Sequence, residues 1–196
     1  MLFVNAGICL FVCLYFAAAF LYPGGSQTDT FSSGFSWTDN YWCNLLDTKA
    51  INGELNGAKP FAQAAMVVLC ITLAFFWFWF PVFAEMGKAK IQIIRYAGIA
   101  AMGTAFFLFI GPHDMVINAA SVFGLVSVFG TIAGLYHLKW DWLLRMGIFN
   151  LIMVGLNNIC YYNKSLLIYL PVVQKITFLF FLLWISGISL NLSKSK

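Results

Sequence analysis

The residues of this chain that could do chemistry are few, and they stand within or beside long apolar stretches. His113 and Asp114 are neighbours, Lys175 lies in a later stretch, and Asn157 and Asn158 are adjacent. Ionisable and amide groups are costly at membrane depth, so each of these positions is a candidate site. An imidazole beside a carboxylate is also the kind of pair that performs general acid–base chemistry. We expect these residues to form a polar cluster in which Asp114 is the counter-charge of Lys175.

The small number of histidines limits metal and haem chemistry. The chain has two, His113 and His137, and on one helix they would stand about 36 Å apart. They cannot share an ion, and a catalytic zinc site needs about three protein ligands. We therefore expect no metal and no cofactor. The sequence has no GxSxG elbow and no glycine-rich phosphate loop, although serines between residues 26 and 36 leave a Ser-His-Asp triad open.

The composition indicates which elements must position these residues. Hydrophobic residues make up 62% of the chain and charged residues 9%, whereas about a quarter of an average soluble domain is charged. A membrane helix needs about 20 mostly apolar residues. Stretches near that length occupy residues 2–21, 61–83, 91–110, 115–135, 143–160 and 166–190. We predict an all-α polytopic membrane protein with six transmembrane helices, forming one bundle over residues 1–196. The first stretch lacks a basic start, so we expect it to be retained, with a cleaved signal peptide as the alternative.

The basic residues predict the orientation. Three regions on one side of a six-crossing chain carry Lys88, Lys90, Arg95, Lys139, Arg145, Lys194 and Lys196. By the positive-inside rule that side is the cytoplasm, so both termini are cytoplasmic and the long loop over residues 22–60 faces outward. The net charge of +4 follows from the same bias, and we expect no nucleic-acid partner.

Small residues indicate how the helices pack. Helices in lipid associate through close backbone approach, which small side chains permit. Gly130 and Gly134 form a GxxxG pair, and the preceding stretch carries Gly98. We predict that the third and fourth helices form a tight hairpin, turned by Gly111 and Pro112.

The loop over residues 22–60 contains too many aromatic rings for a solvated tether, because disordered linkers are poor in them. Trp37 and Trp42 are the largest of these rings. We predict that the loop folds onto the outer mouth of the bundle as a lid, with a short helix over residues 39–46 capped by Thr38 or Asp39. Long ordered loops in compact domains are often functional, so the lid is either structural or covers a binding site.

The depth of Lys175 depends on where the last helix begins. A start at Leu166 would bury the lysine about 13 Å along the axis, whereas a start at Ile176 would leave it at the outer surface. In the first case the sequence predicts a ligand-binding pocket under the lid, formed by His113, Asp114, Asn157, Asn158 and Lys175 with Trp37 and Trp42 above. In the other case each polar group caps a helix or snorkels at an interface.

Three short motifs carry a family resemblance: Tyr22-Pro23-Gly24-Gly25, Trp42-Cys43-Asn44-Leu45 and Pro112-His113-Asp114. With them the chain resembles, over nearly its whole length, a family of bacterial six-helix membrane proteins of unknown function, similar at a distance to the DRAM-type proteins of eukaryotes. The resemblance implies a bacterial inner membrane and supplies no reaction. The eukaryotic relatives are linked to lipid handling and membrane trafficking, which by analogy favours lipid binding.

The sequence thus predicts a non-enzymatic membrane protein that binds membrane lipids or a partner membrane protein at its extracytoplasmic face, as an accessory subunit would. Two alternatives stay open. One is a lipid-modifying enzyme that uses His113 and Asp114 as acid and base. The other is a small carrier or channel with a path past Asn157 and Lys175.

Overall fold

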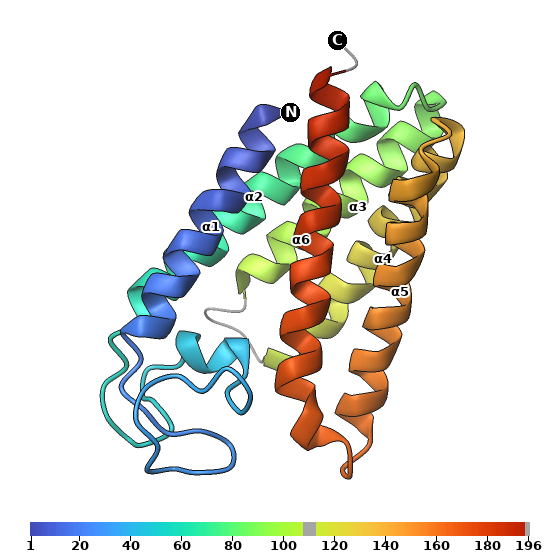
Figure 1. The fold of residues 1–196 in the computed structure, drawn as a ribbon. Coiled ribbons are helices and arrows are strands. Elements are labelled where there is room, and N and C mark those ends of the chain that lie inside the picture. The colour runs from blue at the N-terminus through green and yellow to red at the C-terminus, as the bar shows by residue number, and fades with distance from the viewer. Residues whose placement is uncertain (108–112, 195–196) are drawn as a thin grey trace. The chain divides into compact units, whose positions relative to one another are not determined.

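The computed structural model describes residues 1–107 and 113–194, apart from the side chains of His113 and Asp114. In the described part of the chain, six long helices follow one another (Figure 1), and the short 3-10 helices η1 and η3 stand between some of them. The elements are α1 (Leu2–Phe20), η1 (Trp42–Leu46), α2 (Lys59–Phe83), α3 (Lys88–Phe106), α4 (His113–His137), α5 (Asp141–Tyr162), η3 (Leu167–Tyr169) and α6 (Leu170–Lys194). The prediction of an all-α fold is confirmed for the described residues.

Five of the six long helices, all except α3, are long and apolar enough to cross a membrane. Five of the predicted stretches are therefore confirmed as helices of sufficient length and apolar composition, and their insertion in a membrane stays a prediction. α3 differs because Lys88, Lys90 and Arg95 occupy its first turns, and residues 108–110 of the predicted third crossing lie outside the described part of the chain. A sixth crossing at α3 stays a prediction.

Arg95 shows how α3 accommodates one of its three cations. Its Nε donates a hydrogen bond to the Phe78 carbonyl at 3.0 Å, and the guanidinium carbon lies 4.0 Å from the centre of the Phe78 ring. A cation over an aromatic face is attracted by the negative face of the ring. The carbonyl and the aromatic ring of Phe78 thus hold the charged side chain of Arg95 against α2.

The chain divides into two compact units. One contains residues 1–9, 66–148 and 183–196, and the other contains residues 10–65 and 149–182. In the first unit, α3 packs along α4, which confirms the predicted pairing of these helices. The predicted turn residues Gly111 and Pro112 lie outside the described residues.

Glycines in the first unit allow the close helix contacts. A Cβ on Gly130 would lie 2.3 Å from Ile94 of α3, so this glycine serves the predicted α3–α4 contact. A Cβ on Gly134 would instead meet the Phe80 ring of α2 at 2.9 Å, and one on Gly98 would meet Trp77 of α2 at 2.4 Å. The GxxxG pair therefore contacts two different helices, and Gly98 of α3 faces α2.

The second unit contains most of α1, the loop over residues 21–58, the start of α2, most of α5 and the first half of α6. Its two C-terminal helices are joined by Phe149 and Phe180, whose ring centroids lie 4.9 Å apart. They are also joined by a hydrogen bond from Asn157 Nδ2 to Thr177 Oγ1. This unit carries most of the residues predicted to form a site.

One predicted boundary is wrong. The short loop helix begins at Trp42 rather than at residue 39, because the Asp39 carboxylate accepts hydrogen bonds from the hydroxyls of Ser36 and Thr38 and does not cap it. The amide oxygen of Asn44 accepts from the Tyr41 N–H at 2.7 Å instead. α6 begins at Leu170, directly after η3, so the helical span starts at Leu167, next to the earlier of the two expected positions.

We predict that Gly98→Ala destabilises the protein, because the new methyl group overlaps Trp77, which is buried. Overpacking of this kind costs about 1–3 kcal/mol. Gly103→Ala is the matched control on α3, since a Cβ there meets nothing within 4 Å. Thermal unfolding in detergent micelles should give a lower midpoint for the first variant only. Equal midpoints would contradict the assigned α2–α3 contact.

Candidate functional site

The long loop has a defined backbone path. Gly25 adopts a positive φ of 83°, and a Cβ there would lie 2.4 Å from the backbone nitrogen of Asn52. Only glycine fits this close approach of two chain segments. The Gly25 N–H donates to the Ser32 carbonyl at 2.7 Å, and the Ile51 N–H donates to the Tyr22 hydroxyl at 3.0 Å. The loop is therefore closed on itself across its whole length.

Two buried asparagines join distant parts of this loop. Asn40 Nδ2 donates to the Gly25 carbonyl at 2.9 Å. Asn56 Nδ2 donates to the carbonyls of Leu45 at 3.2 Å and Asp47 at 2.9 Å. Both side chains are buried, and a buried carbonyl left without a donor costs about 1–3 kcal/mol. The two side-chain amides thus satisfy loop carbonyls that, in a β-sheet, would accept from a neighbouring strand.

Trp42 fixes the loop to the helices of its unit. Its ring stacks on Tyr15 of α1, with ring centroids 3.5 Å apart, and lies 4.9 Å from the ring of Phe178 on α6. Its backbone N–H donates to Gln174 Oε1 at 3.3 Å. Trp42, predicted as a ligand-binding residue, is therefore engaged with protein groups on two helices.

Lys175 lies in the second turn of α6 and ties that helix to the loop. Its Nζ donates to the Asn40 carbonyl at 2.5 Å and to the Pro171 carbonyl at 3.1 Å. The ammonium also lies 5.4 Å from the centre of the Phe35 ring. The side chain is half-buried under residues of the loop, and its depth in a membrane stays a prediction.

Trp37 is the more open of the two predicted tryptophans of the loop. Its ring lies 5.2 Å from Phe16 of α1 and 5.3 Å from Phe35, and it is 45% exposed. It therefore has one side against the protein and one side free.

The two predicted asparagines of α5 behave differently from each other. Asn157 Nδ2 donates to the Met153 carbonyl at 3.1 Å and to Thr177 of α6. Asn158 is exposed, and its Nδ2 donates to the Val154 carbonyl of its own helix at 2.9 Å. The structure thus places Asn157 at the α5–α6 contact and Asn158 on an open face.

The structure brings Lys175, Trp37 and Trp42 together in one cluster around the loop. His113 and Asp114 begin α4, but their side chains lie outside the described part of the chain. The predicted pocket that includes them stays a hypothesis.

The electrostatics of the loop favour a protonated thiol and an ionised carboxyl. Burial raises the pKa of Cys43 to about 11, so the thiol is not a thiolate at neutral pH and is a poor nucleophile. Hydrogen bonds from Ser36 and then Thr38 lower the pKa of Asp39 below its usual value. Among the described residues no group of three His, Cys, Asp or Glu side chains is placed to hold a metal ion.

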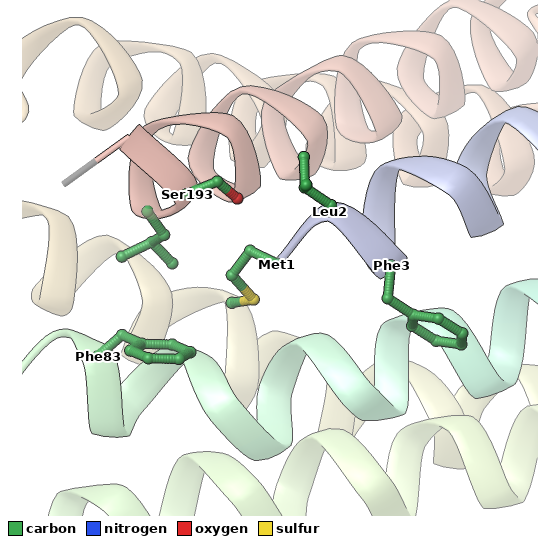
Figure 2. Close-up of a pocket in the computed structure, with 6 residues that line it drawn as sticks. Met1, Leu2, Phe3, Phe83 and Ser193 are labelled. Carbon is green, nitrogen blue, oxygen red and sulfur yellow. The ribbon is translucent and has the colours of Figure 1, made fainter. Parts of the chain in front are cut away.

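A separate hollow of about 350 Å³ lies in the first unit, lined by Met1, Leu2, Phe3, Phe83, Leu192 and Ser193. Figure 2 shows Met1, Phe83 and Ser193 around it. Its lining side chains are apolar except for the Ser193 hydroxyl, Met1 adds the chain's N-terminal amino group, and it contains none of the residues predicted to bind a ligand.

Comparison of the chain with protein-family models, curated proteins and solved structures finds no match. The family resemblance based on three short motifs stays a prediction.

Sequence reasoning missed several residues on which the cluster depends. Asn40, Tyr15 and Gln174 all contact the predicted residues, but each has an ordinary polar or aromatic side chain with no motif around it. Asn56, whose amide holds three loop carbonyls, belongs to the same group. The sequence carries one signal of the burial of Asn56: its amide stands directly before a glycine, in a loop rich in aromatic side chains.

We predict that Asp39 makes the stability of the loop depend on pH. A lowered pKa in the folded state means that folding favours the carboxylate, so this contribution is complete above the ordinary pKa near 4 and is lost as pH falls through the lowered value. Thermal midpoints measured from pH 6 to 3 should fall more for the wild type than for Asp39→Asn.

Ser36→Ala removes the strongest hydrogen-bond donor to this carboxylate. In the Ser36→Ala variant the thermal midpoint should therefore fall less with pH than in the wild type, closer to the fall in Asp39→Asn. Parallel profiles for the wild type and Asp39→Asn would contradict the assigned role of the carboxylate.

Proposed function

We propose that this chain is an integral membrane protein that acts by binding, not by catalysis. The loop over residues 21–58 serves as an extracytoplasmic recognition surface for a membrane lipid or a partner membrane protein. The five helices that are long and apolar enough to cross a membrane support insertion. The bacterial inner membrane is the location that the family resemblance implies.

The observation that carries this proposal is a fixed loop that presents large apolar side chains. Phe31 is 94% exposed, Leu55 is 79% exposed and Trp37 is 45% exposed. Exposed apolar groups gathered on one segment are typical of interaction sites. These side chains lie on a backbone held by buried amides and by Lys175.

The rigidity of the loop bears on its affinity for a ligand. A flexible loop must lose conformational entropy when a partner binds, whereas a preformed loop avoids most of that cost. The loop is joined to α6 through Lys175 and to α1 through Trp42, so it presents its apolar groups from a defined position. This arrangement suits recognition of a surface.

The orientation follows from the basic residues on the connections between helices. With six crossings, Lys88, Lys139 and Lys194 share one side, and the long loop lies on the other. This topology requires α3 to cross, and the contacts of Arg95 with Phe78 give its charge a place on that helix. Both termini are then cytoplasmic.

The alternative functions have less support. No described contact supports acid–base chemistry at His113 and Asp114, because their side chains lie outside the described part of the chain. A carrier path past Asn157 and Lys175 is not favoured either, because both side chains are hydrogen-bonded to neighbouring protein groups.

We predict that Phe31→Ser and Leu55→Ser weaken binding, because each removes an exposed apolar anchor. Loss of one such anchor typically costs about 1–2 kcal/mol, or roughly 5- to 30-fold in affinity. The measurement is mass spectrometry of the lipids and proteins that remain attached in mild detergent, relative to the purified chain.

Gln27→Ala is the matched control, because Gln27 is exposed on the same loop and offers little apolar surface. It should retain the wild-type yield. If all three variants recover the same molecules in the same amounts, the loop is not the recognition surface.

A further inference from the structure

Arg95 of α3 is a half-buried cation that forms no ion pair with a carboxylate in the described part of the chain. Neither α2 nor α3 contains an aspartate or a glutamate, and Glu85, in the turn between these helices, is exposed. The groups that contact the guanidinium are the carbonyl and the ring of Phe78. Both attract a cation, but neither carries a net negative charge.

The contacts with Phe78 leave most of the hydrogen-bond donors of Arg95 unused. A guanidinium has five N–H donors, and the bond to the Phe78 carbonyl uses only the one on Nε. The four donors on the two Nη nitrogens contact no acceptor among the described residues. Such a pair of nitrogens matches two oxygens of a phosphate group. Because Phe78 already holds the guanidinium in place, less freedom is lost when a phosphate binds.

The side of α3 that carries Arg95 changes in character along the helix. Lys88 and Gln92 precede Arg95 by seven and three residues, so helical spacing places all three on one side, and both are exposed. Further along the helix the same side continues with Ile99, which is 39% exposed, and the adjacent Tyr96 is 66% exposed. A basic, polar start followed by apolar groups matches a phospholipid, whose phosphate precedes its acyl chains.

The position of Arg95 along α3 gives its charge a reason to need a counter-ion. Arg95 stands about 10 Å along the helix axis from Lys88, the first residue of α3. The headgroup region on each side of a bilayer is about 5–8 Å thick. If α3 crosses the bilayer, the guanidinium therefore lies where headgroups meet acyl chains. A charge is costly there unless it is paired, and lipid phosphates are the anions at that level.

We propose that Arg95, together with Lys88, binds an anionic phosphate group, supplied by a phospholipid headgroup or by free phosphate. The Nη nitrogens of Arg95 donate to two phosphate oxygens, and the Lys88 ammonium adds a second positive charge. The phosphate is then the counter-ion that α2 and α3 do not supply. The inference rests on the proposed crossing of α3, whose first turns are cytoplasmic in that topology, so this site is separate from the recognition surface of the loop.

The test uses the purified full-length chain in maltoside micelles, which contain no phosphate. Thermal unfolding is measured with added phosphatidylglycerol, with added diacylglycerol, and with inorganic phosphate alone. A ligand that binds only the native state raises the unfolding midpoint with its concentration. We expect phosphatidylglycerol to raise the midpoint and diacylglycerol, which has no phosphate, to leave it unchanged. An equal rise with inorganic phosphate assigns the site to the free ion.

Arg95→Met should weaken the apparent affinity for phosphatidylglycerol at least about tenfold. Arg95→Lys should recover only part of that loss, because it keeps the charge but not the paired donors. Lys88→Met changes an exposed side chain, so it provides a well-folded variant with a smaller expected loss.

Arg145→Met is the matched control. The Nε of Arg145 also donates to a backbone carbonyl, that of Asp141 at 3.4 Å, and its guanidinium carbon lies 6.0 Å from the centre of the Trp142 ring. Arg145 is exposed, however, and Asp141 places a carboxylate one turn away on the same helix. This variant should therefore respond to phosphatidylglycerol as the wild type does.

The proposal is overturned if neither phosphate source raises the midpoint, if Arg95→Met responds like the wild type, or if Arg145→Met loses as much affinity as Arg95→Met. It is also overturned if Glu85→Gln lowers the midpoint as much as Arg95→Met does and added phosphate has no effect, because Glu85 would then be the counter-charge. None of these results bears on partner recovery by Phe31→Ser, so a failure here is separable from a failure of the proposed function.

Discussion

The structure depends on how little of this chain can face water. Charged residues make up 9% of it, and large apolar side chains such as Val122, Phe129 and Ile152 lie exposed on α4 and α5. In hydrocarbon such faces carry no penalty, but backbone polar groups must be satisfied internally, which favours helices. Long apolar helices, glycine contacts between them and a short supply of surface charge all follow from the same constraint.

The loop over residues 21–58 is not an apolar helix, and its backbone carbonyls need hydrogen-bond donors from elsewhere. It has no extended ladder of backbone hydrogen bonds, so side chains satisfy its carbonyls. Asn40 and Asn56 do this within the loop, and Lys175 does it from α6. The Asp39 carboxylate of the loop attracts the charge of this lysine, so the two segments are joined by electrostatics as well as by hydrogen bonds.

Much of the fold was accessible from sequence because it depends on local properties. The apolar stretches predicted six helices, of which five are long and apolar enough to span a membrane, and small residues such as Gly130 predicted the α3–α4 contact. The site was less accessible because its contacts join distant segments. Nothing near Asn40 indicates that its carbonyl accepts from Lys175, 135 positions away. The start of α6 depends on the η3 turn before it, for which the apolar pattern gives no signal.

The most direct test of this account is the topology of the chain in its membrane. A single cysteine placed at Gln27 or at Lys194, in a background without the native cysteines, is treated with a membrane-impermeant maleimide. The account predicts labelling at position 27 in intact spheroplasts and labelling at position 194 only after the membrane is opened. Labelling of both positions in intact spheroplasts, or recovery of the chain in the soluble fraction without detergent, would contradict it.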